Sequence, residues 1–143
     1  MKKRIVLFVV CIMVFVGLGG NISATAVDVV QEPINELLWE NVAIITLDMK
    51  FANGIITSTG NVVGRSGTTA IVALFVLARR NADGTFTEVD RWTATNGSIA
   101  MLLSTSRTTR NQPAGTYRLS VTAHVTRSGK TETVNASYTA ALG

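Results

Sequence analysis

The side chains that could do acid–base chemistry or hold a cation gather in one short stretch of the sequence. Asn81, Asp83, Glu88 and Asp90 are the densest set of oxygen donors. Two carboxylates at a suitable separation can hydrolyse glycosides, and a looser set can bind calcium. Trp92 occupies the twelfth place, where an EF-hand loop needs a glutamate, so that motif fails. Because Glu88 and Asp90 fall on one solvated strand face, we expect surface carboxylates, with a small hydrolase as the alternative.

Nucleophilic catalysis, zinc binding and nucleotide binding find little support in the remaining residue types. His124 is the only histidine, it falls on the outward face of its strand, and no spacing suggests a serine and a carboxylate beside it. The only cysteine, Cys11, lies near the N-terminus, so four nitrogen or sulfur ligands for zinc are lacking. Ser128-Gly129-Lys130-Thr131 ends like a phosphate-binding loop, but His124 stands where its first glycine belongs. We expect no enzymatic activity, no metal and no cofactor.

Five arginines fall in or beside predicted loops, and they are the better candidates for binding a ligand. Arg107 and Arg110 flank two threonines in the longest predicted loop, where they could hold sulfate, phosphate or an acidic glycan. Outward threonines could also meet carbohydrate, although sugar platforms normally add exposed aromatic rings. The aromatic candidates are Trp39, Phe86, Trp92 and Tyr138. From these sets we take Arg107, Arg110 and Trp92 as the candidate ligand-binding residues.

The elements that must position these side chains are short strands. Runs rich in Val, Ile, Thr, Phe and Tyr alternate with turns that contain glycine, a texture typical of sandwiches and small barrels. Asn53-Gly54, Asp83-Gly84 and Asn96-Gly97 favour tight hairpins because their residues tolerate positive φ. Seven antiparallel strands are therefore predicted, at about 42–51, 55–63, 68–79, 85–94, 98–105, 115–127 and 131–140.

Two of these runs indicate where the core lies. In the sixth run, apolar residues alternate with polar ones, which predicts one buried and one solvent-exposed face. The apolar residues are Tyr117, Leu119, Val121, Ala123 and Val125. The third run is apolar throughout residues 70–78, as expected of a central strand that is covered on both sides.

The start of the sixth run carries a resemblance to a known group of folds. Pro113-Ala114-Gly115-Thr116-Tyr117, followed by alternating apolar residues, resembles the tyrosine corner of immunoglobulin-like sandwiches, in which the hydroxyl bonds back to the preceding loop. The resemblance implies structural roles for Tyr117 and Gly115. The chain lacks the cysteine pair and the tryptophan of antibody domains. It resembles the divergent immunoglobulin-like or fibronectin-like sandwiches found among small uncharacterised secreted proteins of Gram-positive bacteria.

The N-terminal residues have the composition of an export signal. Lys2, Lys3 and Arg4 precede an apolar segment over residues 5–18, and a small-x-small motif ends at Ala26. We expect residues 1–26 to be a cleaved signal peptide, residues 27–40 an acidic lead-in, and residues 41–143 one all-β domain. The apolar segment is short for a membrane span, so no stable membrane anchor is expected after cleavage.

Removal of the signal peptide would lower the net charge of the protein. The chain has 13 basic and nine acidic residues, but three of the basic ones belong to the signal, so the mature domain is nearly neutral. Nucleic-acid binding, which needs a basic face, is therefore not expected. We predict a secreted or surface-associated module that binds an extracellular protein or glycan, through loops 64–67, 81–84 and 106–114 at one end or through an edge strand. A structural subunit of a surface polymer is the other alternative.

Overall fold

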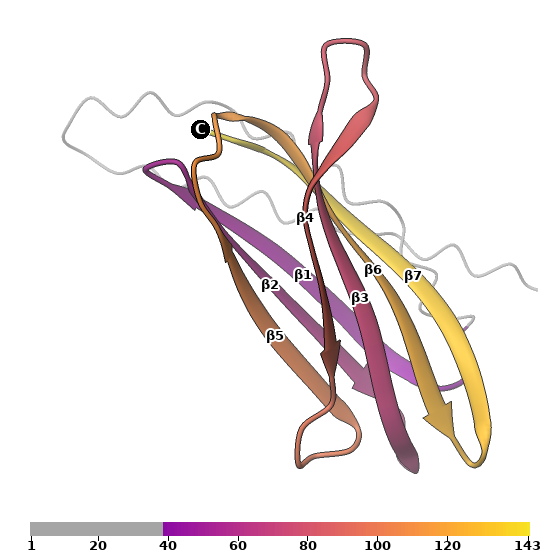
Figure 1. The fold of residues 1–143 in the computed structure, drawn as a ribbon. Helices are drawn as coiled ribbons and strands as arrows, with labels where there is room; N and C mark the ends of the chain where they lie inside the picture. Colours follow the sequence, from indigo (N-terminus) through magenta and orange to yellow (C-terminus); the bar gives the residue numbers. More distant parts are fainter. Residues whose placement is uncertain (1–38) are drawn as a thin grey trace, which may run out of the picture.

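Seven antiparallel strands form two packed sheets in the computed structural model, which describes residues 39–143 (Figure 1). One sheet has three strands in the order β1-β2-β5, and the other has four in the order β4-β3-β6-β7. The predicted all-β sandwich is confirmed. The predicted signal peptide and residues 27–38 of the lead-in lie outside the described residues. The strands are β1 Val42–Ala52, β2 Ile55–Gly64, β3 Thr68–Arg80, β4 Phe86–Thr95, β5 Leu102–Thr109, β6 Gly115–Arg127 and β7 Lys130–Leu142.

Two of the tight hairpins form as their turn residues require. Asn53 and Gly54 have φ of 50° and 72°, and Ser128 and Gly129 have φ of 51° and 75°. Two consecutive positive φ values are the signature of the type I′ turn, whose twist matches that of the strands it joins. These turns fix the antiparallel registers of β1 with β2 and of β6 with β7.

The core lies between the sheets and follows the alternation predicted for β6. Tyr117, Leu119, Val121, Ala123 and Val125 are all buried. The corresponding inner residues of β2 and β3 pack against them from the two sheets, among them Ile56, Val62, Ile71, Phe75 and Leu77.

The predicted coverage of β3 on both faces is wrong. β3 is central in the hydrogen-bonding direction, between β4 and β6, but only its inner residues are fully buried. Val72 is 41% exposed, and Leu74 and Val76 are partly exposed. No described element covers the outer face of the four-stranded sheet, so the continuous apolar run reflects strand propensity as well as burial.

The fifth strand begins four residues later than predicted, and its link to β4 is not a hairpin. The Asn96 side chain and backbone both bond to Ile71, which ends the pairing of β4, and the chain then crosses to the other sheet. β5 consists mostly of serine, threonine and arginine, but its full length pairs with β2, from Val63↔Leu102 to Ile56↔Thr109. Arg107 therefore lies on a strand and not in a loop.

The three loops predicted to share one end do not. The β3–β4 hairpin, the β5–β6 connection and the C-terminus lie at one end of the sandwich (Figure 1). Residues 64–67 lie at the other, where Arg65 N–H donates to Asn41 and Arg127 donates to the carbonyl of Ser66. An antiparallel sandwich alternates its connections between the two ends, so loops 64–67 and 81–84, at opposite ends of β3, cannot form one surface.

The start of the domain is held by hydrogen bonds to β7. The Glu132 carboxylate accepts from the backbone N–H of Glu40 at 3.0 Å and of Asn41 at 2.7 Å. The buried Asn41 amide donates to the carbonyls of Val125 and Lys130. These bonds, together with the packing of Trp39 against the core, fix the point at which the chain enters the sandwich.

Candidate functional site

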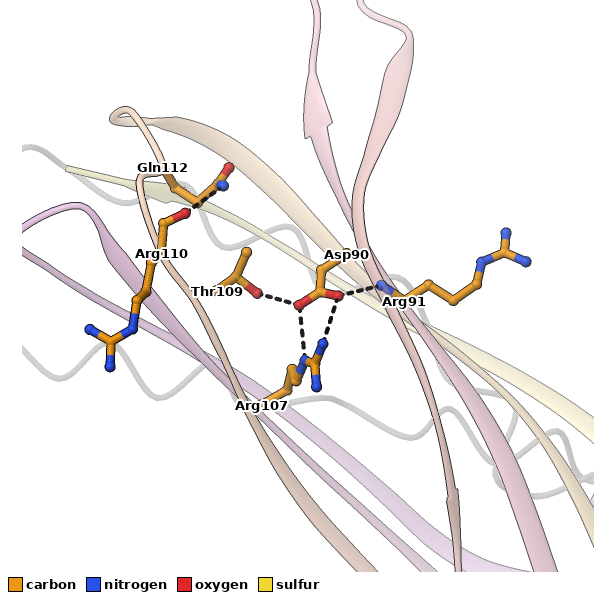
Figure 2. Close-up of polar contacts among 6 residues, drawn as sticks. All are labelled: Asp90, Arg91, Arg107, Thr109, Arg110 and Gln112. Carbon is orange, nitrogen blue, oxygen red and sulfur yellow. Dashed lines mark hydrogen bonds and ion pairs between the residues drawn. The ribbon is translucent and has the colours of Figure 1, made fainter.

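The strongest polar cluster in the described residues joins the two sheets along the side where β4 faces β5 (Figure 2). Arg107 donates to both carboxylate oxygens of Asp90, from Nε at 3.1 Å and from its terminal nitrogen at 3.4 Å. The Thr109 hydroxyl donates to the same carboxylate at 2.8 Å. The Arg91 N–H adds a fourth bond at 2.8 Å. The carboxylate is thus fully occupied by structural partners.

A β-bulge explains why Asp90 lies between the sheets. Leu77 pairs with Asp90 and Ala78 with Glu88, which leaves Val89 as an extra residue in β4. A bulge turns two successive side chains towards one side. Val89 and Asp90 therefore both face inward, whereas Glu88 lies outside and bonds to Arg91 at 2.7 Å. The expectation that Glu88 and Asp90 share one solvated face is wrong.

The electrostatics of Asp90 are those of a structural carboxylate. Partial burial raises its pKa, but the hydrogen bonds from Arg107, Thr109 and the Arg91 N–H outweigh that effect, so the pKa lies below its usual value. A general acid in a glycosidase needs the opposite shift. Asp90 is thus held ionised between its hydrogen-bond donors.

Replacement of Asp90 by asparagine should destabilise the fold by about 1 kcal/mol at neutral pH, because Thr109 and the half-exposed Arg107 lose a charged acceptor. A depressed pKa stabilises the folded state above the ordinary carboxyl pKa, and this contribution disappears as the pH falls through the depressed value. The difference between wild type and D90N should therefore shrink at acid pH. Urea unfolding across the pH range measures it.

The Glu88→Gln variant is the matched control for this prediction. Its ion pair with Arg91 is exposed on both sides, so we expect no measurable change in stability. Equal effects of D90N and E88Q, or a D90N effect that is constant down to acid pH, would contradict a cross-sheet role for Asp90.

The candidate anion site at Arg107 and Arg110 does not assemble. Arg107 is neutralised by Asp90, and Figure 2 shows the Arg110 side chain directed away from it. The carbonyl of Arg110 accepts a hydrogen bond from the Gln112 side chain, which orders the connection into β6. The two arginines thus belong to different surroundings.

Trp92 is a packing residue in this structure. Its ring stacks on Phe75, with centroids 5.3 Å apart and planes 9° from parallel. Trp39 and Tyr138 also pack against the core, and the Phe86 ring lies under the Arg118 guanidinium at 4.0 Å. None of the exposed large apolar residues in the described range is aromatic. An aromatic sugar platform is therefore not formed by these rings.

The two residues with predicted structural roles, Tyr117 and Gly115, lie at the start of β6. The Tyr117 hydroxyl donates to the carbonyl of Pro113 at 2.6 Å, and the Tyr117 side chain is fully buried. Gly115 opens β6 opposite Leu142, where an added Cβ would come within 3.3 Å of the Arg79 guanidinium. The bond anchors the β5–β6 connection to the core.

The remaining oxygen donors order the tip of the β3–β4 hairpin. Asp83 accepts from the N–H and hydroxyl of Thr85, and the Asn81 amide donates to Thr85 and Thr87. The hydroxyl of Thr85 lowers the pKa of Asp83 below its usual value. Among residues 39–143, no three histidine, cysteine or acidic side chains come together as metal ligands. His124 bonds to Thr133 on the outer face of the four-stranded sheet.

An exposed apolar corner is the surface feature that the sequence did not indicate. Ile44, Val63 and Leu102 lie side by side across β1, β2 and β5, on the outer face of the three-stranded sheet. Ile99 and Met101 come just before Leu102 in the chain, where the N–H of Leu102 donates to the carbonyl of Ile99 and the N–H of Gly64 donates to the carbonyl of Met101. We call these five residues the apolar corner. Its exposed fractions are 44% at Ile44, 58% at Ile99 and 39% at Met101.

The apolar corner is unusual within this molecule. Only four large apolar residues of the described range are exposed, and three of them belong to the apolar corner. The next row on the same face, Thr46, Asn61 and Ser104, is polar. Exposed large apolar side chains that gather at one end of a sheet are typical of an interaction site.

No family model matches the sequence, and no curated protein matches it. Among solved structures, the chain is similar to the solution structure of R. palustris CsgH, with 14% identity and a TM-score of 0.38. The similarity covers 64% of this chain and 88% of that one. Within residues 39–143, no helix is long and apolar enough to cross a membrane.

Proposed function

We propose that this protein is an exported, non-catalytic interaction module that binds a protein partner through the apolar corner. The observation that carries the proposal is the exposure of Ile44, Ile99 and Met101 at one end of the three-stranded sheet. Burial of such side chains in an interface releases water and favours association. A protein partner fits this surface better than a glycan, because the corner has no aromatic ring.

Three carboxylates of the domain are held by hydrogen-bond donors, which supports a binding role over a hydrolytic one. Asp90 is held by Arg107, Glu88 by Arg91, and Glu132 by two backbone N–H groups. An acid–base pair for hydrolysis would need two carboxylates that face a common substrate position. Glu88 and Asp90 point to opposite faces of β4, which offers no such position.

The strand order supports a place among immunoglobulin-like or fibronectin-like sandwiches. β1, β2 and β5 share one sheet, and β3, β6 and β7 share the other, as in immunoglobulin domains. In constant-type immunoglobulin domains the fourth strand pairs with the fifth. Here β4 pairs with β3 instead, and this difference favours the fibronectin-like alternative. The bond from Tyr117 to Pro113 adds the tyrosine corner. Such sandwiches commonly act as extracellular binding domains, in agreement with the export signal predicted at residues 1–26.

The double variant I44D/M101D tests the proposal. Two carboxylates in the apolar corner should weaken partner binding by at least about tenfold, since each would be desolvated without a counter-charge. Binding of the purified protein to secreted and surface proteins of the producing cells, followed by titration with the partner recovered, measures the loss. Both side chains are already exposed, so the melting temperature should change little.

Val72→Asp provides a matched control. Val72 is 41% exposed, close to the 44% of Ile44, but it lies on the outer face of the other sheet. We expect V72D to bind the partner as tightly as wild type. Equal binding by wild type, V72D and I44D/M101D would contradict the proposed surface, and hydrolysis of a glycan by the purified protein would contradict the non-catalytic role.

A further inference from the structure

The outer face of the four-stranded sheet carries two arginines on neighbouring strands. Arg118 of β6 pairs with Ala78 of β3, and Arg80 follows two positions later on β3. Arg80 in turn pairs with Phe86 at the start of β4. Side chains at paired positions lie on one face of a sheet, and diagonal neighbours remain within reach of long side chains. We call Arg80, Phe86 and Arg118 the arginine patch.

The Arg118 side chain crosses β3 to reach the aromatic ring on β4. Its guanidinium carbon lies 4.0 Å from the centroid of the Phe86 ring, a cation–π contact. Ala78, the residue of β3 between them, is buried although no described element covers this face, as expected if the Arg118 side chain lies over it. Within residues 39–143 the buried Arg118 Nε has no hydrogen-bond partner. Packing and the ring therefore hold this guanidinium, and no carboxylate does.

Neither arginine of the patch forms an ion pair within residues 39–143. The acidic residues around the patch are Glu88, which lies opposite Ala78, and Asp83 in the hairpin turn. Glu88 accepts hydrogen bonds from Arg91 through both of its carboxylate oxygens, at 3.0 and 2.7 Å. Asp83 is held by the N–H and the hydroxyl of Thr85. Two positive charges thus remain uncompensated at one end of this face.

The patch lies at the base of the β3–β4 hairpin, which projects beyond the rest of the sheet (Figure 1). Arg80 is exposed, and its guanidinium lies beside Gly84 in the turn. Arg79 and Arg110 are also exposed at this end of the sandwich. Their charges add to the positive potential around the patch, which attracts anions over a longer range.

We propose that the arginine patch binds a tetrahedral oxyanion, a phosphate or sulfate group. Each guanidinium presents its donors as a planar fork, and two forks can share the oxygens of such a group. A carboxylate has only two oxygens, which a single guanidinium satisfies, as Arg91 does for Glu88. The two uncompensated charges also match a phosphate group, which carries about −1.5 to −2 at neutral pH. The patch lies on the other sheet from the apolar corner and at the opposite end, so the two sites are separate.

Isothermal titration calorimetry of the purified full chain at low ionic strength tests the proposal with four probes. These are inorganic phosphate, inorganic sulfate, dextran sulfate and uncharged dextran. Binding of the inorganic ions would support a free anion as the ligand. Binding of dextran sulfate without them would support an anionic group carried on a polysaccharide. Dextran should not bind, and added salt should weaken the binding of every anionic probe.

A pair of double variants with equal net charge locates the site. R80Q/R118Q should weaken anion binding by at least about tenfold, because both guanidinium groups are lost. K50Q/K130Q removes the same two charges from exposed lysines outside the patch, and it should change the affinity by less than about threefold. Melting temperatures and far-UV circular dichroism confirm that each variant is folded.

Arg118→Lys separates recognition by the guanidinium from attraction by charge. Lysine keeps the positive charge but lacks the planar fork that stacks on Phe86. R118K should therefore weaken binding by about three- to tenfold, although the net charge is unchanged.

Three results would overturn the proposal. The first is a wild-type chain that binds none of the three anionic probes at low ionic strength. The second is an equal loss of affinity in R80Q/R118Q and K50Q/K130Q, since net charge alone would then explain binding. The third is an R118K variant that binds as tightly as wild type.

Discussion

Tyr117→Ala is expected to destabilise the protein by about 4 kcal/mol, the largest effect of any single substitution considered. Tyr117 is the largest fully buried side chain in the described residues. Its removal leaves a cavity between the sheets and also releases the β5–β6 connection, which the hydroxyl holds through Pro113. Since small domains are stable by only about 5–15 kcal/mol, this variant should be close to unfolding at moderate temperature.

Tyr117→Phe separates the two contributions. It keeps the buried ring and removes only the hydrogen bond, so a loss of about 1 kcal/mol is expected. Burial raises the pKa of Tyr117 above its usual value. A raised phenol pKa means that the unfolded chain ionises first, so wild type should lose its advantage over Y117F as the pH rises above about 10. Chemical unfolding at neutral and alkaline pH measures both effects, and equal losses in Y117F and Y117A would contradict the cavity argument.

The sequence predicted six of the seven strands to within about two residues, because hydrophobic alternation and turn residues are local signals. β5 was misplaced because its serines and threonines have the composition of a loop. Its strand conformation comes from pairing with β2, a contact between residues about 50 positions apart, such as Ile56 with Thr109. Only tertiary pairing could reveal it.

The candidate site was less predictable than the fold, because its geometry depends on registers between strands. One extra residue at Val89 moved Asp90 from the solvated face to the inside, where it meets Arg107. The apolar corner likewise exists only because Ile44, Val63 and Leu102 fall in one row across three strands. Each of these residues alone is ordinary in a strand, so no local pattern distinguishes them.

Gly60→Ala is expected to destabilise the protein by about 2–3 kcal/mol, although it adds a single methyl group. Gly60 lies on the inner face of β2, and a Cβ there would overlap the Phe75 ring. The ring cannot move aside freely, because Phe75 is fully buried and stacks on Trp92. The backbone of Gly60 has no positive φ, so the constraint is space between the sheets and not conformation. Gly97, where an added Cβ meets nothing within 4 Å, is the matched position, and G97A should leave stability almost unchanged.

A double-mutant cycle with Phe75→Leu tests whether this close approach is the cause. Leucine is shorter than phenylalanine, so F75L alone should cost about 1 kcal/mol through lost stacking and packing. In G60A/F75L the added methyl group would occupy space that the ring has left. The double variant should therefore be more stable than the sum of the single losses predicts, by about 1–2 kcal/mol, as measured by urea unfolding. Additive losses would contradict this cause. They would mean that G60A destabilises the protein through the backbone of β2, and not through a clash with the Phe75 ring.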